Sequence, residues 1–588
     1  MKEAFLHLGW FFKKTYKRYI LVAFFLLLLS ITPVLPAKLL GIAIDEISTG
    51  VLTSNHLILL VVGLLGVAIG RYLINWVYHY EINKLGHQLS YELREKYIQH
   101  LFELDSETYE SYTKGDLISR ATDDLQNLTV LATNFLQTVF FNTGVVLSAI
   151  FMMVIINPLL TLASVIAMPF AIFWLNKKRQ KKRAYYKIHR EIYADMTENV
   201  LESVEGVKTV RAYANEEQDF IKTKKAIDRD IDSWWKIIKF ESIYSPLFEL
   251  VYTVSYFIAI SLGSYMVITS NISAGDLVTF LMYVGMLYGP LVALSNVLNQ
   301  VNNIMISDQR YHEVLNIMPK IANTENPKPI LGFNKIEFKN VVFKYPKDNQ
   351  EVLMDVSFTI EKGKTIGIVG PTGSGKSTMI RQLLREYNVL GGEILIDSVD
   401  IKEFNIDDIH DLIGYVPQDH ILFRRSVDDN ILIGNPRATV RDINRAVALA
   451  DFNKDLKELP FGLETMVAEF GGSLSGGQRQ RLSIARALVR NPEILILDDS
   501  LSAVDALTEA NIIRNLKEAR QGKTNIIIAH RFSAVAMADE ILVVENGRIT
   551  NRGTHEELLK YDNWYKMQYL KQINELNEDG AGEDNDQH

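Results

Sequence analysis

Long apolar runs fill the first half of the chain, whereas the second half alternates short apolar segments with polar turns. A helix of about 20 apolar residues spans a bilayer, and the first half contains segments of that length. They lie at roughly 18–40, 56–79, 132–156, 158–176, 245–268 and 277–300. The pattern predicts six transmembrane helices, with the third and fourth joined by the tight turn Asn157-Pro158.

Charges between these spans predict the orientation in the membrane. Residues 41–55 and 269–276 contain no Lys or Arg, whereas residues 177–190 are strongly basic. Because Lys and Arg collect in cytoplasmic loops, we expect a multi-pass protein of the cell membrane with its N-terminus and C-terminal half in the cytoplasm. A basic run can also bind nucleic acid, but its place at a membrane exit favours the topology signal. The net charge of −8 gives no sign of a nucleic-acid partner.

The stretches between spans are too regular for loops. Residues 80–131 and 177–244 combine many charges with helical periodicity, which predicts membrane helices that continue well into the cytoplasm. Each stretch must turn back, and the candidate turns lie at 113–120 and 205–213. Residues 2–18 mix aromatic and basic side chains, which predicts a short helix in the membrane interface beside lipid phosphates.

Few ionisable side chains lie inside the predicted spans, and each needs a reason to be there. Glu249 either attracts a cationic substrate into an aromatic cavity, or is protonated or hydrogen-bonded to a neighbouring span. Arg71 is expected to pair with a carboxylate or to snorkel rather than to bind a ligand. The candidate substrate-cavity residues are Glu249, Tyr252, Tyr256, Tyr283 and Tyr288, although aromatic residues at helical spacing also pack without any ligand.

A polar, Pro-containing segment separates the two halves. We expect a membrane domain at 1–318, a linker at 319–335, an α/β nucleotide-binding domain at 336–575 and a disordered acidic tail at 576–588. The fold class is therefore a membrane α-helical domain fused to an α/β phosphate-loop domain.

The sequence has no Cys, which excludes disulfides and thiolate metal sites.

Residues 370–377 fit the phosphate-loop pattern G-x-x-x-x-G-K-[ST], between an apolar strand and a helix. Lys376 is expected to reach the β- and γ-phosphates of ATP, and Ser377 to hold Mg²⁺. The alternative, a Gly-rich turn without ligand, does not explain Lys376. The predicted nucleotide contacts here are Gly370, Pro371, Thr372, Gly373, Ser374, Gly375, Lys376, Ser377 and Thr378.

Further polar residues at strand ends complete a predicted ATP site. The apolar run 494–497 ends in Asp498, which would hold Mg²⁺, and Asp499, which would polarise the attacking water. Gln418 could sense both the metal and the membrane domain, and His530 would contact the γ-phosphate. Each residue alone is weak evidence, but their order along the chain predicts an ATPase.

Residues 474–481 read LSGGQRQR and open a helix. With the preceding motifs, the chain resembles an ATP-binding cassette exporter over residues 1 to about 572. The resemblance implies that Tyr345 stacks on adenine and that 113–120 and 206–213 are coupling helices. It further implies that the loop 502–505 is exchanged between paired cassettes, with Asp505 as a nucleotide contact. It also implies that the signature of one cassette caps ATP held by another, so two chains pair. The signature residues are Leu474, Ser475, Gly476, Gly477 and Gln478.

Two positions depart from the pattern of active exporters. Asp499 stands where they carry Glu, and Phe470 stands where they carry Arg. The shorter side chain of Asp499 moves its carboxylate back by about 1 Å, and a misplacement of that size can cost about 10²-fold in rate. The string 494–500 is similar to one member of paired bacterial multidrug exporters, in which one ATP site is degenerate. That resemblance implies a heterodimer with a second, homologous half-transporter.

The function expected from these features is ATP- and Mg²⁺-dependent export of amphipathic or cationic drugs by a lipid-embedded heterodimer. A lipid or peptide exporter on the same scaffold is an alternative, although no peptidase domain precedes the first span. A regulator or ATP-gated channel is a further alternative, which the weakened Asp499 keeps open.

Overall fold

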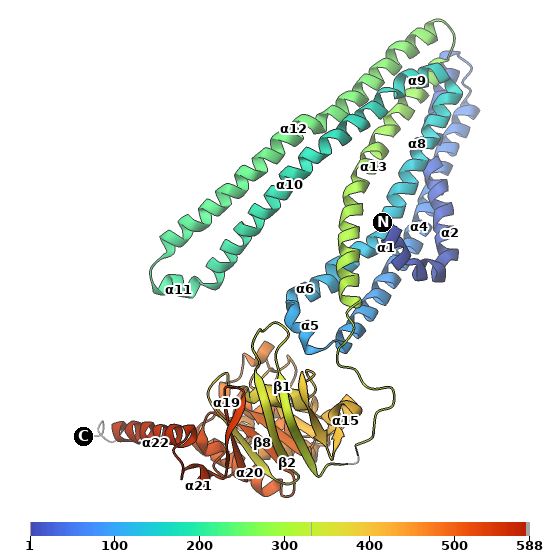
Figure 1. Ribbon diagram of the computed structural model, residues 1–588. Coiled ribbons are helices and arrows are strands. Elements are labelled where there is room, and N and C mark those ends of the chain that lie inside the picture. The colour runs from blue at the N-terminus through green and yellow to red at the C-terminus, as the bar shows by residue number, and fades with distance from the viewer. Residues whose placement is uncertain (1, 331, 584–588) are drawn as a thin grey trace. The chain divides into compact units, whose positions relative to one another are not determined.

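The computed structural model describes residues 2–330 and 332–583. Side chains at 167–183, 244, 245, 247, 248, 295, 298, 299, 469 and 575–583 lie outside the described part. The chain forms two compact units, of which one comprises Met1–Leu101 with Gly115–Asn316, and the other Phe102–Lys114 with Ile317–His588 (Figure 1). The second unit begins beside the expected boundary at 318, but it also includes the short segment Phe102–Lys114, which was expected in the membrane domain.

The first unit consists of long helices. They are α1 (Lys2–His7), α2 (Gly9–Ile31), α3 (Val34–Ser48), α4 (Ser54–Glu103), α6 (Lys114–Ser119), α7 (Leu125–Val130), α8 (Leu136–Ile156), α9 (Pro158–Val165), α10 (Ala167–Glu205), α11 (Val207–Ala212), α12 (Glu216–Ile268) and α13 (Ala274–Leu315), with the π-helical turns η1 (Arg120–Asp124) and η2 (Leu131–Phe135). Asn157 accepts a hydrogen bond from the backbone N–H of Leu160 at 3.0 Å and starts α9. The predicted tight turn at Asn157-Pro158 is thus confirmed.

Five segments of the described part are long and apolar enough to cross a membrane: Gly9–Ser48, Ser54–Glu103, Lys114–Ile156, Glu249–Ile268 and Ala274–Leu294. They cover five of the six predicted spans. The remaining span, 158–176, falls partly on side chains outside the described residues, so its membrane crossing stays a prediction, although its backbone is helical in α9 and α10.

Helices α3 and α13 approach each other at two glycines. A Cβ added at Gly275 would lie 2.0 Å from the carbonyl oxygen of Gly41. Asp45 accepts hydrogen bonds from the backbone N–H of Gly275 at 2.7 Å and from the hydroxyl of Ser273 at 2.6 Å. Only glycine permits this backbone contact, because any side chain would collide with it.

The charged helix extensions turn back at two places, and one of them differs from the prediction. Helices α10 and α12 run side by side and are joined by the short α11, as predicted for 205–213 (Figure 1). The turn predicted at 113–120 is wrong, since Lys114–Ser119 is helix α6. The chain turns instead at α5 (Ser106–Ser111), where the Asp105 side chain caps the backbone N–H of Thr108. Asp105, which caps the first turn of α5, marks the place where the chain turns better than Gly115 does.

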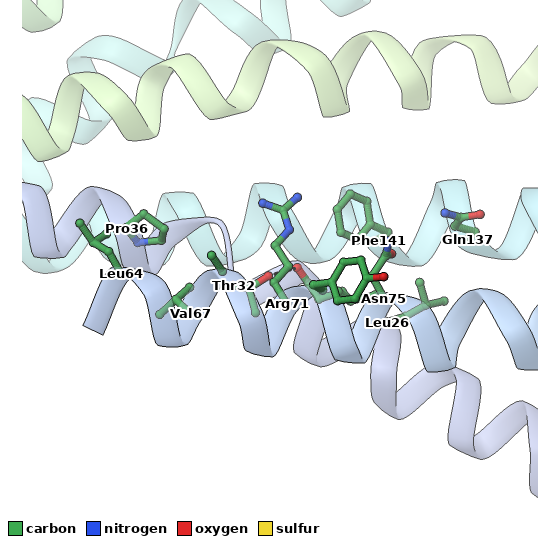
Figure 2. A pocket seen from close by; sticks show the side chains of 12 residues that line it. Leu26, Thr32, Pro36, Leu64, Val67, Arg71, Asn75, Gln137 and Phe141 are labelled. Atoms are coloured by element: carbon green, nitrogen blue, oxygen red, sulfur yellow. Dashed lines mark hydrogen bonds between the residues drawn. The ribbon is translucent and has the colours of Figure 1, made fainter. Parts of the chain in front are cut away.

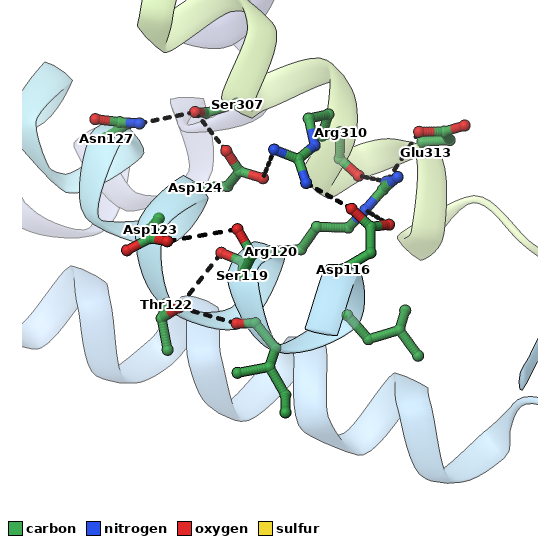
Figure 3. Close-up of polar contacts among 12 residues, drawn as sticks. Asp116, Ser119, Arg120, Thr122, Asp123, Asp124, Asn127, Ser307, Arg310 and Glu313 are labelled. Atoms are coloured by element: carbon green, nitrogen blue, oxygen red, sulfur yellow. Dashed lines mark hydrogen bonds and ion pairs between the residues drawn. The ribbon is translucent and has the colours of Figure 1, made fainter. Parts of the chain in front are cut away.

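An ion-pair network ties α6 and η1 to the end of α13 (Figure 3). Arg310 bridges Asp116 at 2.6 Å and Asp124 at 3.3 Å. Arg120 pairs with Asp116 and with Glu313, both at 2.8 Å. Each charge of this network faces an opposite charge, which is the arrangement that half-buried ions require.

The interfacial helix predicted at 2–18 is divided in two. Helix α1 ends at His7, and α2 then begins at Gly9 with non-helical backbone angles at Thr15, φ −115° and ψ 16°. Leu8 and Phe11 are buried. The free energy gained by burying Leu8 and Phe11 is larger than the cost of interrupting the helix.

Two sheets build the second unit. An antiparallel sheet has the order β2-β1-β4-β5, and a larger sheet has the order β10-β9-β3-β8-β7-β6, in which β9, β3, β8, β7 and β6 are parallel neighbours. The strands are β1 (Lys335–Phe343), β2 (Leu353–Glu361), β3 (Thr365–Val369), β4 (Gly391–Ile396), β5 (Val399–Asp400), β6 (Ile413–Val416), β7 (Ile494–Asp498), β8 (Thr524–Ile528), β9 (Glu540–Glu545) and β10 (Arg548–Gly553). Parallel strands end at the same edge of the sheet, where ligands bind in α/β folds.

Helices and short helical turns cover these sheets. They are α14 (Lys376–Leu383), η3 (Ile401–Glu403), α15 (Ile406–Leu412), α16 (Val427–Leu432), α17 (Val440–Leu449), α18 (Asn453–Glu458), η4 (Gly462–Glu464), η5 (Glu469–Gly471), α19 (Gly476–Leu488), α20 (Ala506–Ala519), η6 (Phe532–Ala534), α21 (His555–Leu558) and α22 (Trp564–Glu583). The tail expected to be disordered from 576 is helical to Glu583, because each further residue of an established helix adds a hydrogen bond. Residues 584–588 of the tail lie outside the described residues.

Candidate nucleotide site

The phosphate loop lies between β3 and α14 and depends on two unusual glycines. Gly370 has φ 155°, and a Cβ there would lie 2.0 Å from the carbonyl oxygen of Val544. Gly375 has φ 102° directly before α14. These positions exclude other residues and leave backbone N–H groups at a helix N-terminus, which is a site for anions.

The side chain of Lys376 folds back onto the phosphate loop and donates hydrogen bonds to it. Its side chain is buried, and its Nζ donates to the carbonyl oxygens of Gly370 at 2.9 Å and Pro371 at 2.8 Å. Burial lowers the pKa of Lys376, while the charges of Asp499 and Asp498 oppose that shift. A triphosphate would give this cation the negative partner that its surroundings supply only in part.

Ser377 and Asp498 form the oxygen pair predicted to hold Mg²⁺. The hydroxyl of Ser377 donates to Oδ1 of Asp498 at 2.8 Å, and the hydroxyl of Tyr415 donates to Oδ2 at 3.3 Å. Burial raises the pKa of the Asp498 carboxyl group. A hydroxyl and a carboxylate are donors that fit Mg²⁺. When bound, Mg²⁺ neutralises charge that develops on the phosphates.

Asp499 follows in a left-handed conformation with φ 46°. Its backbone N–H donates to the carbonyl oxygen of Ile528 at 2.9 Å, which fixes the turn after β7. Gln418 Nε2 donates to Oδ2 of Asp499 at 3.4 Å. Asp499 and His530 line the same small cavity. The structure therefore brings Gln418, Asp499 and His530 to one edge of the sheet, beside Asp498.

Tyr345 lies next to the phosphate-loop helix. Its hydroxyl is 3.1 Å from Oγ1 of Thr378, and its ring contacts the rings of Phe343 and Tyr387 edge-on, with centroids 5.0 and 5.3 Å apart. The side chain is half-buried. Stacking of this ring on adenine stays a prediction.

The signature begins helix α19. Ser475 accepts a hydrogen bond from the backbone N–H of Gln478 at 3.3 Å, and the Gln478 side chain accepts one from the N–H of Ser475 at 3.0 Å. This capping box fixes the loop and leaves the helix N-terminus at the surface. Leu474 is buried, whereas Gly476 and Gly477 are half-buried. Among the described contacts, no hydrogen bond joins residues 474–478 to the phosphate loop.

Asp505 and Phe470, which the sequence also singles out, lie in different surroundings. Asp505 caps α20 by accepting a hydrogen bond from the backbone N–H of Thr508 at 2.9 Å, and hydrogen bonds from Thr508 lower the pKa of Asp505. Its contact with nucleotide stays a prediction. Phe470 has φ 52° and is 64% exposed, and nothing in the described residues explains why it stands in place of Arg.

The predicted substrate-cavity residues separate into two groups. Tyr283 is fully buried, and its hydroxyl donates to the carbonyl oxygen of Val34 at 3.1 Å. It belongs to α13 and packs against α3, so the structure does not support it as a cavity residue. Tyr252 lies between the rings of Tyr256 and Tyr288, with centroids 6.0 and 5.2 Å apart. The side chain of Glu249 is exposed.

Sequence reasoning missed that α5 packs within the second unit, together with the nucleotide-binding strands and helices. The Glu110 carboxylate accepts from the hydroxyl of Tyr387, and its carbonyl oxygen accepts from Lys347. Glu107 pairs with Lys320 at 2.6 Å. These contacts place α5 against the same Tyr387 that touches Tyr345. The cap signal at Asp105 could have located this helix.

The fold and the site together define a class: a membrane-spanning protein whose helical unit is fused to a phosphate-loop ATP-binding unit. The family model described as "ABC transporter transmembrane region" matches residues 19–291, and the model described as "ABC transporter" matches residues 353–502. These matches cover most of the membrane helices and, in the nucleotide site, the phosphate loop, Asp498, Asp499 and the signature, whereas Tyr345, Asp505 and His530 lie outside them.

Relatives match over nearly the whole chain. It is 39% identical over 586 residues to "Probable multidrug resistance ABC transporter ATP-binding/permease protein YheI" of Bacillus subtilis (strain 168), covering 98% of this chain and 99% of that protein. It is 30% identical over 586 residues to "Multidrug resistance-like ATP-binding protein MdlA" of Escherichia coli (strain K12), covering 100% and 99%. The solved structure of a bacterial Atm1-family ABC exporter with ATP bound matches with a TM-score of 0.78 and 26% identity, covering 95% of this chain and 98% of that one.

The chain therefore belongs to the ABC transporter family, with one membrane domain and one ATP-binding domain of the exporter type. It is a multi-pass membrane protein that couples ATP hydrolysis to export.

Proposed function

We propose that this chain exports amphipathic small molecules, cationic drugs among them, as one subunit of a heterodimer. Its nucleotide-binding unit and N-terminus face the cytoplasm in this proposal. The names of its relatives in Bacillus subtilis and Escherichia coli, which describe multidrug resistance, support the substrate class. The basic segment 177–190 supports the orientation.

The proposal of a heterodimer rests on the identity of residue 499. Asp499 follows Asp498 at the end of β7, in the position of the residue that polarises the attacking water. Its carboxylate is one methylene closer to the backbone than that of Glu, and its turn is fixed by the hydrogen bond to Ile528. The backbone therefore does not move forward to compensate, and the site hydrolyses ATP slowly.

The signature of the same chain supports the other half of the proposal. Ser475 and Gln478 form an intact capping box, so the N-terminus of α19 is ready to bind a phosphate held by another cassette. A partner with Glu at the position of Asp499 would then hold the fast site, completed by this signature. A heterodimer of this kind would have one ATP site that hydrolyses slowly and one that hydrolyses fast.

Transport then depends on this chain's own residues at each step. Lys376 and the phosphate-loop N–H groups bind the β- and γ-phosphates, and Ser377 and Asp498 hold the metal-bound nucleotide. Docking of the signature onto the partner's nucleotide closes the cassettes. Helix α5 contacts the cassette of its own chain through Glu110 and Tyr387, whereas α11 has no buried residue and offers its surface to the partner's cassette.

Uptake into inside-out vesicles tests this proposal. Vesicles contain this chain with a homologous half-transporter that carries Glu after its Mg²⁺-binding Asp, and ethidium serves as the cationic probe. We expect ATP-driven accumulation with both chains and little with this chain alone. Equal accumulation by this chain alone would contradict the heterodimer, and passive ion flux without ethidium uptake would contradict export.

A further inference from the structure

Two helices that are far apart in the sequence meet at a carboxylate shared by two histidines. His7 is the last residue of α1, whereas Asp308 and His312 lie near the end of α13 (Figure 1). Nδ1 of His7 lies 2.9 Å from Oδ2 of Asp308 and 3.2 Å from Oδ1. Nδ1 of His312 lies 3.2 Å from Oδ1 of Asp308 and 3.0 Å from its backbone carbonyl oxygen.

The helices explain why these three side chains come together. Asp308 and His312 are four residues apart, so they lie on the same face of α13. Helix α1 packs on α13, and its last residue, His7, reaches that face. The rings of His7 and His312 stack there, with centroids 3.8 Å apart and an interplanar angle of 29°. Both rings therefore present a nitrogen to the same carboxylate.

Asp308 has no permanently charged cation among its described partners. Its side chain is only 7% exposed, and its ion pairs within the described residues are with His7 and His312. A buried carboxylate requires a cationic partner or a metal ion. Protonation of both rings would supply positive charge, but it would place two like charges in stacked rings, where they repel. A divalent cation neutralises the carboxylate while both imidazoles stay uncharged.

Two imidazoles and one carboxylate are a ligand set that suits Zn²⁺. One ligand atom from each side chain lies within 4.8 Å of those of the other two. Ligands about 2.1 Å from a tetrahedral zinc ion lie about 3.4 Å apart. The side chain of His7 is 41% exposed, so its ring is free to rotate and close the difference. Mg²⁺ fits less well, because it prefers oxygen ligands.

We propose that His7, Asp308 and His312 bind one Zn²⁺ ion, which links α1 to α13. His7 precedes the first membrane-crossing segment, Gly9–Ser48, and the other two ligands follow the last one, Ala274–Leu294, so an ion can reach them from water. Helix α1 has only six residues, which is too short for a helix that is stable by itself. The bound ion holds this helix on α13.

One chain provides all three ligands, so the site does not depend on where a second chain lies. A hollow among α2, α3, α4 and α8 differs in this respect (Figure 2). It is lined by the exposed side chains of Arg71 and Asn75, on helix faces that a paired chain can cover. None of its described lining residues is His, Asp or Glu, so it offers no comparable set of metal ligands.

Calorimetric titration of the purified full chain with zinc chloride, after removal of any affinity tag, tests the proposal. Excess Mg²⁺ occupies the oxygen ligands of the nucleotide site, and ATP is left out so that the result is independent of transport. We expect one Zn²⁺ per chain, and we expect His7→Gln and His312→Gln each to lower the affinity at least tenfold. Even a residue that only supports a metal ligand contributes about 10–100-fold in affinity.

His56→Gln is the matched control for these variants. His56 is an exposed histidine that pairs with Glu46 at 3.1 Å, and it belongs to no group of three metal ligands among the described residues. Its replacement should leave the Zn²⁺ affinity unchanged. The unfolding temperature should rise with Zn²⁺ in wild type and His56→Gln but not in His7→Gln, because an ion that binds only the folded state stabilises it.

X-ray absorption at the zinc edge identifies the ligands without any substitution. We expect nitrogen and oxygen neighbours at about 2.0–2.1 Å, with scattering from two imidazole rings. Three results would each overturn the proposal: no Zn²⁺ binding by wild type, wild-type affinity in both His7→Gln and His312→Gln, or a zinc shell that consists of oxygen alone.

Discussion

The hydroxyl of Ser377 donates a 2.8 Å hydrogen bond to Asp498, although 121 residues separate them. Ser377 lies in the first turn of α14, after β3, and Asp498 ends β7; both strands pair with β8. The sheet thus brings a phosphate-loop hydroxyl and a buried carboxylate together before any ligand binds. Preorganisation of this kind avoids the cost of assembling a metal site on binding.

Replacing Lys376 with Ala tests the phosphate loop. The variant loses the buried cation that faces the phosphates, and a charge-assisted hydrogen bond contributes about 1.5–3 kcal/mol. We therefore expect ATP affinity to fall at least tenfold in a calorimetric titration. Lys362→Ala is the control, because Lys362 is an exposed cation at 3.7 Å from Glu493. Unchanged ATP affinity in the Lys376 variant would contradict the assigned role.

The affinity for Mg²⁺ should fall as the pH is lowered, because Asp498 then becomes protonated. Burial raises the pKa of Asp498, so this carboxyl holds its proton at a pH where an exposed Asp is ionised. Its protonated form stabilises the fold at low pH, and that contribution is lost as pH rises through the raised pKa. Mg²⁺ needs the ionised form, so Mg²⁺-dependent nucleotide affinity should fall about tenfold per unit below that pKa.

Titrations of Mg²⁺ at a series of pH values measure this effect. The decline should begin above the range in which an ordinary Asp titrates, about pH 3.9. Asp498→Asn should bind Mg²⁺ weakly at every pH. An Mg²⁺ affinity in wild type that stays constant down to the ordinary range would contradict the account.

The helix that carries the signature depends on a buried ion pair. Arg481 of α19 donates two hydrogen bonds to Asp455, both 2.7 Å long, and both side chains are largely buried. Asp455→Ala leaves the guanidinium unpaired, which costs about 3–5 kcal/mol of unfolding free energy. The neighbouring Lys454→Ala removes an exposed cation whose pair with Asp451 is 3.5 Å long, and it should cost less than about 1 kcal/mol. Thermal unfolding of both variants gives the comparison; similar melting temperatures would refute it.

Because α3 and α13 are in contact at Gly275, replacing this glycine with Ala should destabilise the protein much more than the same change elsewhere. Gly275→Ala places a methyl group 2.0 Å from the Gly41 carbonyl oxygen, so the two backbones must separate. We expect a loss of about 1–3 kcal/mol or more. Gly66→Ala in α4 meets no atom within 4 Å and should be neutral or stabilising by about 1 kcal/mol. Melting temperatures in detergent measure both, and equal values would argue against the close contact.

The sequence predicted the nucleotide site well because its motifs are local and sit at strand ends. The pattern at 370–377 and the run ending at Asp498 both specify a residue and its element, and parallel pairing then brings them together. The partners of those residues were harder to predict. Tyr415 reaches Asp498, and Tyr387 joins Glu110 to Tyr345, through contacts between distant segments that no local pattern encodes.

Helices of the membrane unit were predictable from apolar length, but their ends and contacts were not. Gly115 was read as a turn and lies within α6, whereas the true turn begins at the Asp105 cap. Tyr283 was read as a cavity residue because its type and spacing also suit a substrate site. Its burial against Val34 depends on how α3 meets α13, which is a tertiary property.

The account's central claim is that Asp499 makes this chain's own ATP site slow. Steady-state ATP hydrolysis by the purified chain alone, as wild type and as Asp499→Glu, tests it most directly. We expect wild type to turn over slowly and the Glu variant to gain roughly tenfold or more, since the longer side chain restores about 1 Å of reach. Rapid hydrolysis by wild type alone, or an Asp499→Glu variant that is no faster, would contradict the claim.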